Sequence, residues 1–196
     1  MQFVEPIRDI KKVAQIKNML RGENKIRDLL LFELGINSAL RISDLLGIQI
    51  NDLFDDWWNI KTFFDIKEEK TNKSNRITIT PKVQETLKLY RELYEHIVTK
   101  PNYYVFFHSK RTPKGEKHID RKQAWKMIHQ WCIDVWLKGN FWGHTLRKTW
   151  GYQARLNAIP LEIIQHKLNH SSLAVTQRYL WITADEIADA CNKLDL

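Results

Sequence analysis

Residues 168–180 read LNHSSLAVTQRYL and place a histidine and a tyrosine nine residues apart around a helix start. Ser171 and Ser172 are favourable N-cap residues, because a serine oxygen accepts a hydrogen bond from a backbone N–H of the first helical turn. Nine residues of unbroken helix would turn through about 900° and leave the side chains of His170 and Tyr179 on opposite faces. We therefore expect His170 to lie on the turn before the helix, where it can share a site with Tyr179.

The chemistry of Tyr179 depends on its surroundings. A tyrosine hydroxyl is a weak nucleophile at its ordinary pKa of about 10. It becomes effective when the phosphate that it attacks is surrounded by cations and proton-transfer groups. Those groups must come from other parts of the chain.

The composition is that of a soluble globular protein with a positive charge. The 196 residues are 43% hydrophobic and 28% charged, enough for one well-buried domain. Lysine and arginine number 31 against 23 acidic residues, which gives a net charge of +8. This charge favours a polyanionic partner such as nucleic acid, although many soluble proteins are mildly basic.

Cysteine usage and hydropathy indicate a cytoplasmic protein. Cys132 and Cys191 lie far apart and have no partner at metal-ligand spacing, so neither a disulfide framework nor a zinc site is expected. The N-terminal sequence MQFVEPIRDIKK lacks the apolar core of a signal peptide, and no apolar run reaches the roughly 18 residues that span a bilayer. We expect no cofactor, no metal and no membrane association.

Apolar residues at helical spacing predict a mostly helical chain. The expected helices span residues 7–20, 23–34 (ended by Gly35), 39–46, 81–97, 120–137, 145 onward, 160–169, 173–180 and 184–196. Residues 60–80 alternate with period 2 around EEKTNKSNR, which predicts a β-hairpin in which Lys70 ends the first strand and Lys73 lies in the turn. Residues 108–118 are expected to form a basic loop. The predicted fold class is mainly α with a small antiparallel β-hairpin or sheet, in one domain over residues 1–196.

Six side chains suited to phosphate chemistry occur in order along the chain: Arg41, Lys70, His144, Arg147, His170 and Tyr179. Each one alone is more often structural or solvent-exposed, and H-x-x-R is frequent by chance. Arg41 and Asp44 lie three residues apart on an expected short helix, a spacing that a surface ion pair also explains. His144 and Arg147 lie at the N-terminal end of a helix, where the helix dipole favours an anion.

Together with the local sequences LRISDLL, HTLRK and LNHSS followed by TQRYL, these residues resemble the catalytic domain of the tyrosine recombinase (phage integrase) family. The resemblance extends over about residues 10–179. It implies that Arg41 and Arg147 match the two family arginines. Lys70 matches the hairpin lysine, and Asp44 takes the acidic supporting position.

The resemblance implies cutting and rejoining of DNA strands without metal or ATP. Tyr179 would attack a backbone phosphate, form a 3′-phosphotyrosyl bond and release a 5′-hydroxyl. The two arginines would neutralise charge on the non-bridging oxygens, and His170 would add a hydrogen bond. Lys70 would protonate the departing 5′-oxygen, and His144 would assist proton transfer from the tyrosine. No carboxylate cluster has the spacing of Mg²⁺ ligands.

Further basic residues are expected to contact DNA, namely Lys73, Arg76 and Lys148. Because the hairpin turn is about one residue longer than usual in the family, Lys73 also competes with Lys70 as the general acid. Asn169 stands where the family usually has glycine before the histidine. Asparagine is the next residue most tolerant of positive φ, so the turn is expected to survive.

The motifs begin too early in the chain for the N-terminal DNA-clamping domain of most family members. The chain therefore resembles short members that consist of the catalytic domain alone, such as the invertases that switch fimbrial expression. Residues 184–196 resemble the C-terminal helix that family members pass to a neighbouring subunit, although a helix packed on its own domain is equally expected.

The implied partners are double-stranded DNA, further copies of the chain in a dimer or tetramer on DNA, and accessory DNA-bending proteins. Two alternatives remain open at this point. One is relaxation of DNA in the manner of a type IB topoisomerase. The other is a DNA-binding accessory protein with weak or no recombinase activity of its own. The sequence does not distinguish integration, excision and inversion, and it does not identify the target site.

Overall fold

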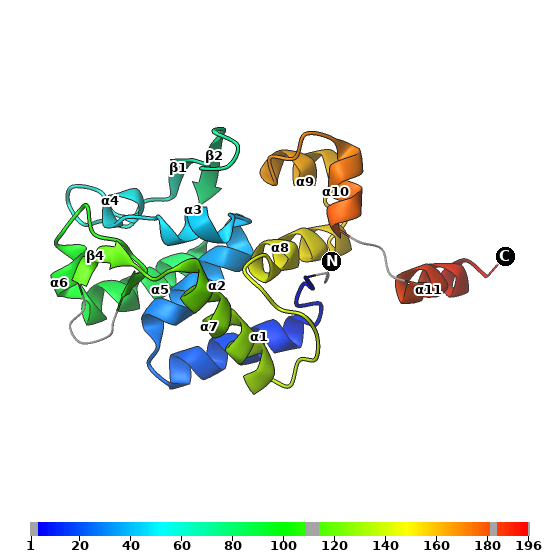
Figure 1. Cartoon of the computed structure of the whole chain (residues 1–196), viewed down its shortest axis with the longest axis horizontal. Coiled ribbons are helices and arrows are strands. Elements are labelled where there is room, and N and C mark those ends of the chain that lie inside the picture. Colours follow the sequence, from blue (N-terminus) through cyan, green and yellow to red (C-terminus); the bar gives the residue numbers. More distant parts are fainter. Residues whose placement is uncertain (1–3, 109–113, 181–183, 196) are drawn as a thin grey trace.

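Helices dominate the structure, and the strands form two antiparallel pairs, which confirms the predicted fold class (Figure 1). The computed structural model describes residues 4–108, 114–180 and 184–195. The helices are α1 (Ile10–Gly22), α2 (Ile26–Ser38), α3 (Ile42–Leu46), α4 (Ile50–Leu53), α5 (Pro81–Leu93), α6 (Glu95–Val98), α7 (Arg121–Asp134), α8 (Thr145–Leu156), α9 (Leu161–Lys167), α10 (Leu173–Leu180) and α11 (Ala184–Leu194). The strands are β1 (Phe63–Lys67), β2 (Ser74–Thr78), β3 (Phe107–His108) and β4 (Lys114–His118).

The central element is α2, and α1, α5 and α8 pack around it. Most of its residues are buried, as its high apolar content predicts. Its one buried carboxylate, Glu33, forms an ion pair with Lys17 at 2.8 Å and accepts a hydrogen bond from the Thr86 hydroxyl at 2.6 Å. The buried charge is therefore compensated, and α2 supports the main hydrophobic core.

Gly35 was expected to end the second helix, and this prediction is wrong. The helix α2 continues to Ser38 and ends at Ala39, which has a left-handed φ of 59°. Gly35 is there because α8 approaches closely: a Cβ atom at this position would lie 2.4 Å from Leu146 Cδ1. The glycine is therefore a packing residue rather than a helix stop.

The β1–β2 hairpin is present as predicted, with Phe63 paired to Thr78 and Lys67 paired to Ser74. Lys70 does not end the first strand, since β1 ends three residues earlier and Lys70 lies in the turn. The expected loop over residues 108–118 contains a strand, β4, that pairs with β3. Its lysine-rich sequence resembles a loop, and only pairing with β3 makes it a strand.

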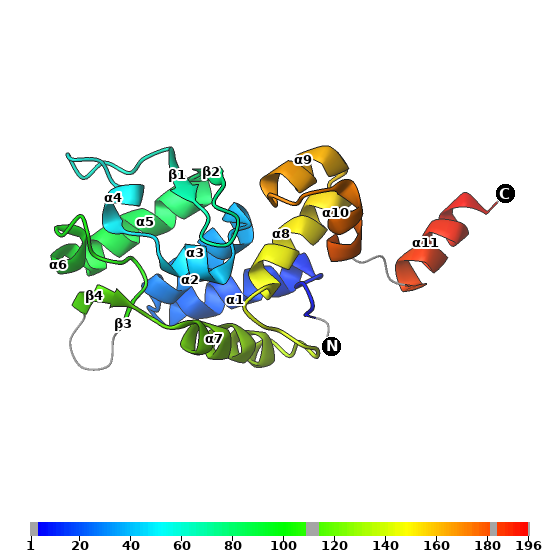
Figure 2. The same cartoon turned by 45° about the horizontal axis from the view of Figure 1, so that its top comes forward.

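The last helices of the chain form a second, smaller cluster. Buried side chains of α8, α9 and α10 meet there with Ala39. Gly151 permits the approach of α10, because a Cβ at this position would lie 2.8 Å from Leu180 Cδ2. Figures 1 and 2 show α8 and α9 on the side of the β1–β2 hairpin and α3, with α10 packed against α8 and α9, whereas α11 stands away from the other helices.

We expect Gly35→Ala to destabilise the protein by ~1–3 kcal/mol, although alanine is intrinsically the better helix former. The new Cβ would lie 2.4 Å from Leu146 Cδ1 and 3.0 Å from Leu146 Cβ, so rotation of the leucine side chain cannot remove both contacts. Gly22→Ala at the end of α1 is the matched control, because a Cβ there meets no heavy atom within 4 Å. Equilibrium urea denaturation measures both variants. Equal unfolding free energies would contradict the close approach of α2 and α8.

Candidate active site

Four segments carry the predicted catalytic residues: the β1–β2 turn, the N-termini of α3 and α8, and the segment from the α9–α10 turn into α10 (Figures 1 and 2). Hydrogen bonds connect them. Arg147 on α8 donates to the backbone before α3 and after α9. Glu68, at the start of the hairpin turn, accepts from Arg41 and from Asn169. Residues from distant parts of the sequence therefore share one site.

Arg147 is almost fully buried, with 2% of its surface exposed. Its Nη1 donates to the carbonyl oxygen of Ala39 at 2.7 Å, and its Nη2 donates to the carbonyl oxygen of Leu168. Burial is the main cause that lowers the pKa of Arg147, and the charge of Arg41 adds to it. Two carbonyl groups thus fix the plane of the guanidinium before any ligand arrives, as electrostatic catalysis requires.

Arg41 is the N-cap of α3 and has an extended backbone, so it does not share a helix face with Asp44. Its Nη1 donates to the carboxylate of Glu68 instead. Asp44 is buried, and its Oδ1 accepts a hydrogen bond from the backbone N–H of Glu69 at 2.9 Å. Burial raises the pKa of Asp44, whose Oδ2 has no hydrogen-bond partner among the described residues. Both side chains therefore connect α3 to the hairpin.

His170 lies on the turn before α10, as expected, and Asn169 before it has a left-handed φ of 49°. Ser172 caps the helix by accepting a hydrogen bond from a first-turn backbone N–H at 3.3 Å. The imidazole Nδ1 lies 3.1 Å from the Thr176 hydroxyl, and the ring meets the ring of Tyr179 edge to face at 5.0 Å between centroids. The predicted sharing of one site by His170 and Tyr179 is confirmed geometrically.

The hydroxyl of Tyr179 points into the site. Its oxygen is buried and has no hydrogen-bond partner of normal geometry among the described residues. Burial raises the pKa of the Tyr179 phenol to about 12, although the nearby guanidinium of Arg147 and the charge of Arg41 act in the opposite direction. The phenol is therefore protonated in the free protein and lies close to two arginines.

Lys148 is 8% exposed, and its Nζ lies 5.1 Å from the centre of the Tyr179 ring. The side chain is mostly buried in the free chain, and the expected contact between Lys148 and DNA stays a prediction. Burial, together with the charge of Arg8, lowers the pKa of Lys148 to about 8. The side chain is placed to act on the tyrosine ring by a cation–π contact.

His144 and Lys70 lie at the open side of the site. His144 is the N-cap of α8, and its side chain is exposed. Burial of part of its ring is the main cause that lowers the pKa of His144, and the charges of Arg147, Arg41, Lys148 and Lys70 all act in the same direction. The side chain of Lys70 is exposed in the hairpin turn.

Two further residues of the site were missed from the sequence. Glu68 is fully buried, although its place in a polar turn-rich segment suggested a solvated residue. Lys167 ends α9, and its Nζ donates to the carbonyl oxygen of Arg76 at 3.0 Å. Burial lowers the pKa of Lys167 to about 8, against the opposing effect of Glu68. No local sequence pattern identifies either residue, because each takes its place through contacts between the hairpin and distant segments: Glu68 with Arg41 and Asn169, and Lys167 with Arg76.

Lys73 and Arg76 lie on the exposed side of the hairpin. Arg76 forms two hydrogen bonds with Asp65, at 2.9 and 2.7 Å, and lies 4.2 Å from the centre of the Phe63 ring. A DNA phosphate would have to compete with Asp65 for this guanidinium. Lys73 accepts a hydrogen bond from the Glu68 N–H through its own carbonyl oxygen, at 3.0 Å.

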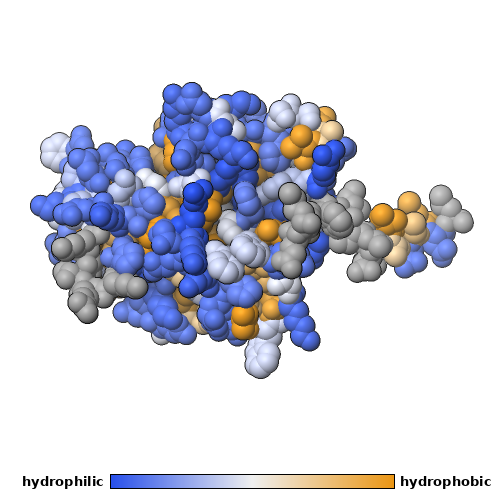
Figure 3. Space-filling model, viewed as in Figure 1, coloured by the Kyte–Doolittle hydropathy of each residue, from blue (hydrophilic) through white to orange (hydrophobic). Residues whose placement is uncertain are grey.

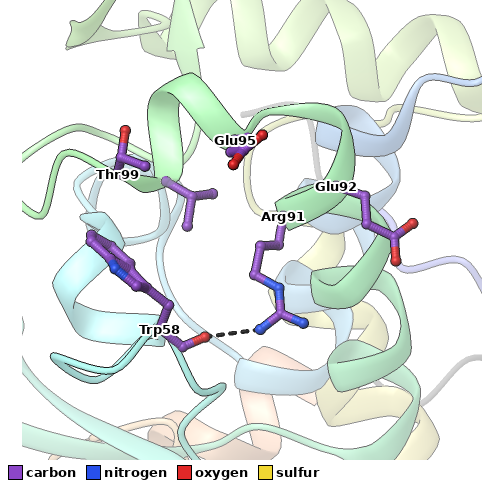
Figure 4. A pocket seen from close by; sticks show the side chains of 6 residues that line it. Trp58, Arg91, Glu92, Glu95 and Thr99 are labelled. Atoms are coloured by element: carbon purple, nitrogen blue, oxygen red, sulfur yellow. Dashed lines mark hydrogen bonds between the residues drawn. The ribbon is translucent and has the colours of Figure 1, made fainter.

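A cleft elsewhere on the surface is separate from this site (Figure 4). It is lined by Trp58, Arg91, Glu92, Glu95, Val98 and Thr99. Within the described ranges, no group of three or more histidine, cysteine, aspartate or glutamate side chains is placed to hold a metal ion. None of the helices in the described part of the chain is long and apolar enough to cross a bilayer.

The sequence of the chain is similar to those of known integrases and recombinases. The model of the phage integrase family matches residues 8–186. A probable integrase/recombinase, YoeC of Bacillus subtilis, is 37% identical over 94% of this chain and 93% of its own length. The tyrosine recombinase XerA of Pyrococcus furiosus is 27% identical over 96% of this chain, which spans only 60% of that protein.

Solved structures show the same fold at low sequence identity. A crystal structure of XerA recombinase superposes with a TM-score of 0.74 at 16% identity and covers 96% of this chain and 63% of its own. A lambda integrase dimer bound to a COC′ core site gives a TM-score of 0.64 at 16% identity, over 93% of this chain and 64% of its own. The predicted catalytic-domain fold is confirmed.

We expect His170→Gln to reduce the loss of stability on acidification. Burial, and then the charges of Arg147 and Arg41, lowers the pKa of His170 to about 4. As the pH is lowered, the imidazole binds a proton near pH 6.5 in the unfolded chain but only near pH 4 in the folded one. The unfolding free energy therefore decreases as the pH is lowered through this range. Removing the imidazole should abolish a decrease on the order of 1–2 kcal/mol between pH 7 and pH 5.

Urea denaturation at a series of pH values measures this effect, with His96→Gln as the control. His96 is an exposed histidine on α6, away from the site. If His170→Gln and the native chain lose the same stability between pH 7 and pH 5, the imidazole is not held neutral by its surroundings.

Proposed function

The chain belongs to the phage integrase family, and we propose that it is a site-specific DNA recombinase that acts through a 3′-phosphotyrosyl intermediate. The observation that carries this proposal is the placement of the Tyr179 hydroxyl, buried beside Arg147 and within the electrostatic influence of Arg41. A phosphodiester bound between the two guanidinium groups would bring its phosphorus to the phenol oxygen. The two guanidinium groups would then stabilise the negative charge that develops on the phosphate as the tyrosine attacks.

In the proposed reaction, the Tyr179 oxygen attacks the phosphorus as the bond to the 5′-oxygen breaks. The phenol proton leaves to an acceptor, and a donor protonates the 5′-oxygen, so the charges balance. His144 and His170 suit the acceptor role, because the pKa of each imidazole is lowered and the rings are neutral near pH 7. Arg41 and Arg147 neutralise the non-bridging oxygens.

The donor for the departing 5′-oxygen is Lys70 in this proposal. Its turn lies beside the site, and its charge acts on His144. The phosphotyrosyl bond conserves the energy of the broken phosphodiester, so a second 5′-hydroxyl can reverse the reaction and exchange strands. We therefore propose double-stranded DNA as the substrate, without a metal ion or ATP.

We further propose that the chain works as an oligomer on DNA and that α11 packs on a neighbouring copy. The helix stands away from its own domain, and its Ile187 and Leu194 are 55% and 67% exposed. Figure 3 shows hydrophobic residues gathered on one side of this helix. An amphipathic helix of this kind is stabilised when its apolar face is covered.

We expect Tyr179→Phe to abolish covalent attachment to DNA while DNA binding is retained. The change removes one oxygen and keeps the ring that contacts His170 and Lys148. A supercoiled plasmid that carries the DNA flanking the gene is incubated with protein in EDTA, and SDS-resistant protein–DNA adducts are measured. Adducts that persist in the variant would refute the nucleophile. Relaxation of any plasmid, regardless of sequence, would favour the topoisomerase-like alternative.

A sulfur-substituted substrate distinguishes Lys70 from Lys73. We expect Lys70→Ala to slow adduct formation by about 100-fold or more, because general acid catalysis contributes about 10²–10⁴-fold. A 5′-bridging phosphorothiolate should restore the rate, because a thiolate leaves without protonation. Lys73→Ala in the same turn is the matched control and should lose no more than a few-fold on either substrate. If the phosphorothiolate restored the rate of Lys73→Ala and not that of Lys70→Ala, Lys73 would be the general acid instead of Lys70.

A further inference from the structure

We propose that Glu68 is a positioning residue that holds Arg41, the Lys70 turn and the His170 turn in one fixed arrangement. This inference rests on the function proposed above, because the three segments carry the groups assigned to catalysis there. Glu68 itself touches no reacting atom in that mechanism. It acts through the side chains that it holds.

The carboxylate of Glu68 is fully buried and accepts hydrogen bonds from three directions. Its Oε2 accepts from Arg41 at the start of α3 and from the Thr71 hydroxyl in the hairpin turn, the latter at 3.1 Å. Its Oε1 accepts from the side-chain amides of Asn75 on β2, at 2.7 Å, and Asn169, at 2.8 Å. Four donors thus fill the acceptor sites of one carboxylate.

The backbone of Glu68 belongs to the same arrangement. Its N–H donates to the carbonyl oxygen of Lys73 at 3.0 Å, and its carbonyl oxygen accepts from the N–H of Asn72 at 2.8 Å. Lys70 lies within the loop of chain that these two hydrogen bonds close. The position of the Glu68 side chain and the shape of the turn that presents Lys70 are therefore coupled.

Burial alone would raise the pKa of Glu68, but the hydrogen bonds from Asn75 and Asn169 and the charges of Arg41 and Arg147 lower it overall. The carboxylate is therefore ionised at neutral pH. A buried charge is costly when a partner is lost, so the geometry of its donors is tightly constrained. An arginine has five N–H donors in one plane, and fixing one of them orients the others.

Asn169 does more than tolerate a left-handed turn. Glycine, the usual family residue, would adopt a φ of 49° at least as easily, but it has no amide to donate to Glu68. The side chain of Asn169 therefore links the turn before His170 to the carboxylate that holds Arg41. Asparagine in place of glycine therefore adds one donor to the hydrogen bonds around Glu68.

Asn169→Gly tests this link without backbone strain, and Asn24→Gly is its matched control. Asn24 also has a left-handed φ, of 54°, but lies in the turn between α1 and α2. We expect Asn169→Gly to slow adduct formation by Tyr179 about tenfold, the effect of one hydrogen bond to a charged group, with DNA affinity changed less than twofold. Asn24→Gly should keep the native rate.

Glu68→Gln and the double variant Glu68→Gln/Asn169→Gly show whether Asn169 acts through Glu68. We expect about a 100-fold loss of adduct formation for Glu68→Gln and no further loss in the double variant, since contacting residues of one network are not additive. Losses that multiply, or a native rate for Asn169→Gly, would overturn the proposal.

Amide hydrogen exchange provides a readout that is independent of DNA cleavage. The amides of Glu68 and Asn72 should exchange about tenfold faster in Asn169→Gly than in Asn24→Gly. Unchanged exchange at these amides would refute the coupling, whatever the cleavage rates. If the native chain forms no Tyr179 adduct but the amides respond, the proposed function fails and the coupling of the turn stands.

Discussion

The buried guanidinium of Arg147 is the constraint on which the rest of the structure depends. It donates to the carbonyl oxygen of Ala39, where α2 ends, and to that of Leu168, where α9 ends. A cation this deeply buried is tolerated only when its donors are satisfied. The two carbonyls therefore fix α8 against the start of the α3 segment and against the turn that carries His170. The same side chain therefore holds the tertiary structure together and is the one proposed to bind the scissile phosphate.

Burial, together with the positive charge concentrated around Arg147, decides the protonation states of the neighbouring histidines. Burial and the two arginines lower the pKa of His170 to about 4, and similar causes lower that of His144. Both imidazoles are thereby kept neutral, which the proposed role of a proton acceptor requires. Glu68 supplies the buried negative charge within this group of cations. In the proposed function these cations bind the phosphate, and the Glu68 carboxylate accepts a hydrogen bond from one of them, Arg41.

Close approach of helices is the second requirement for this centre, and glycine supplies it. Gly35 lets Leu146 of α8 lie against α2, and Gly151 lets Leu180 of α10 lie against α8. A methyl group at Gly35 would push α8, which carries Arg147, away from α2, and one at Gly151 would push α8 away from α10, which carries Tyr179. The two glycines therefore affect the position of Arg147 and its distance from Tyr179.

The sequence by itself determined the helical class, the hairpin and the left-handed turn at Asn169, because these depend on local periodicity and capping, whereas the catalytic roles of the six residues stay predictions. It failed where contacts between distant segments decide the outcome. Gly35 resembled a helix stop but is a packing position, and Arg41 turned out to pair with Glu68 rather than with Asp44. Glu68 is a polar residue in a polar segment, and Lys148 was expected to contact DNA; folding buries both side chains. Burial and the direction of a side chain across the hairpin are properties of the tertiary structure, since no local spacing encodes which segment will cover a residue.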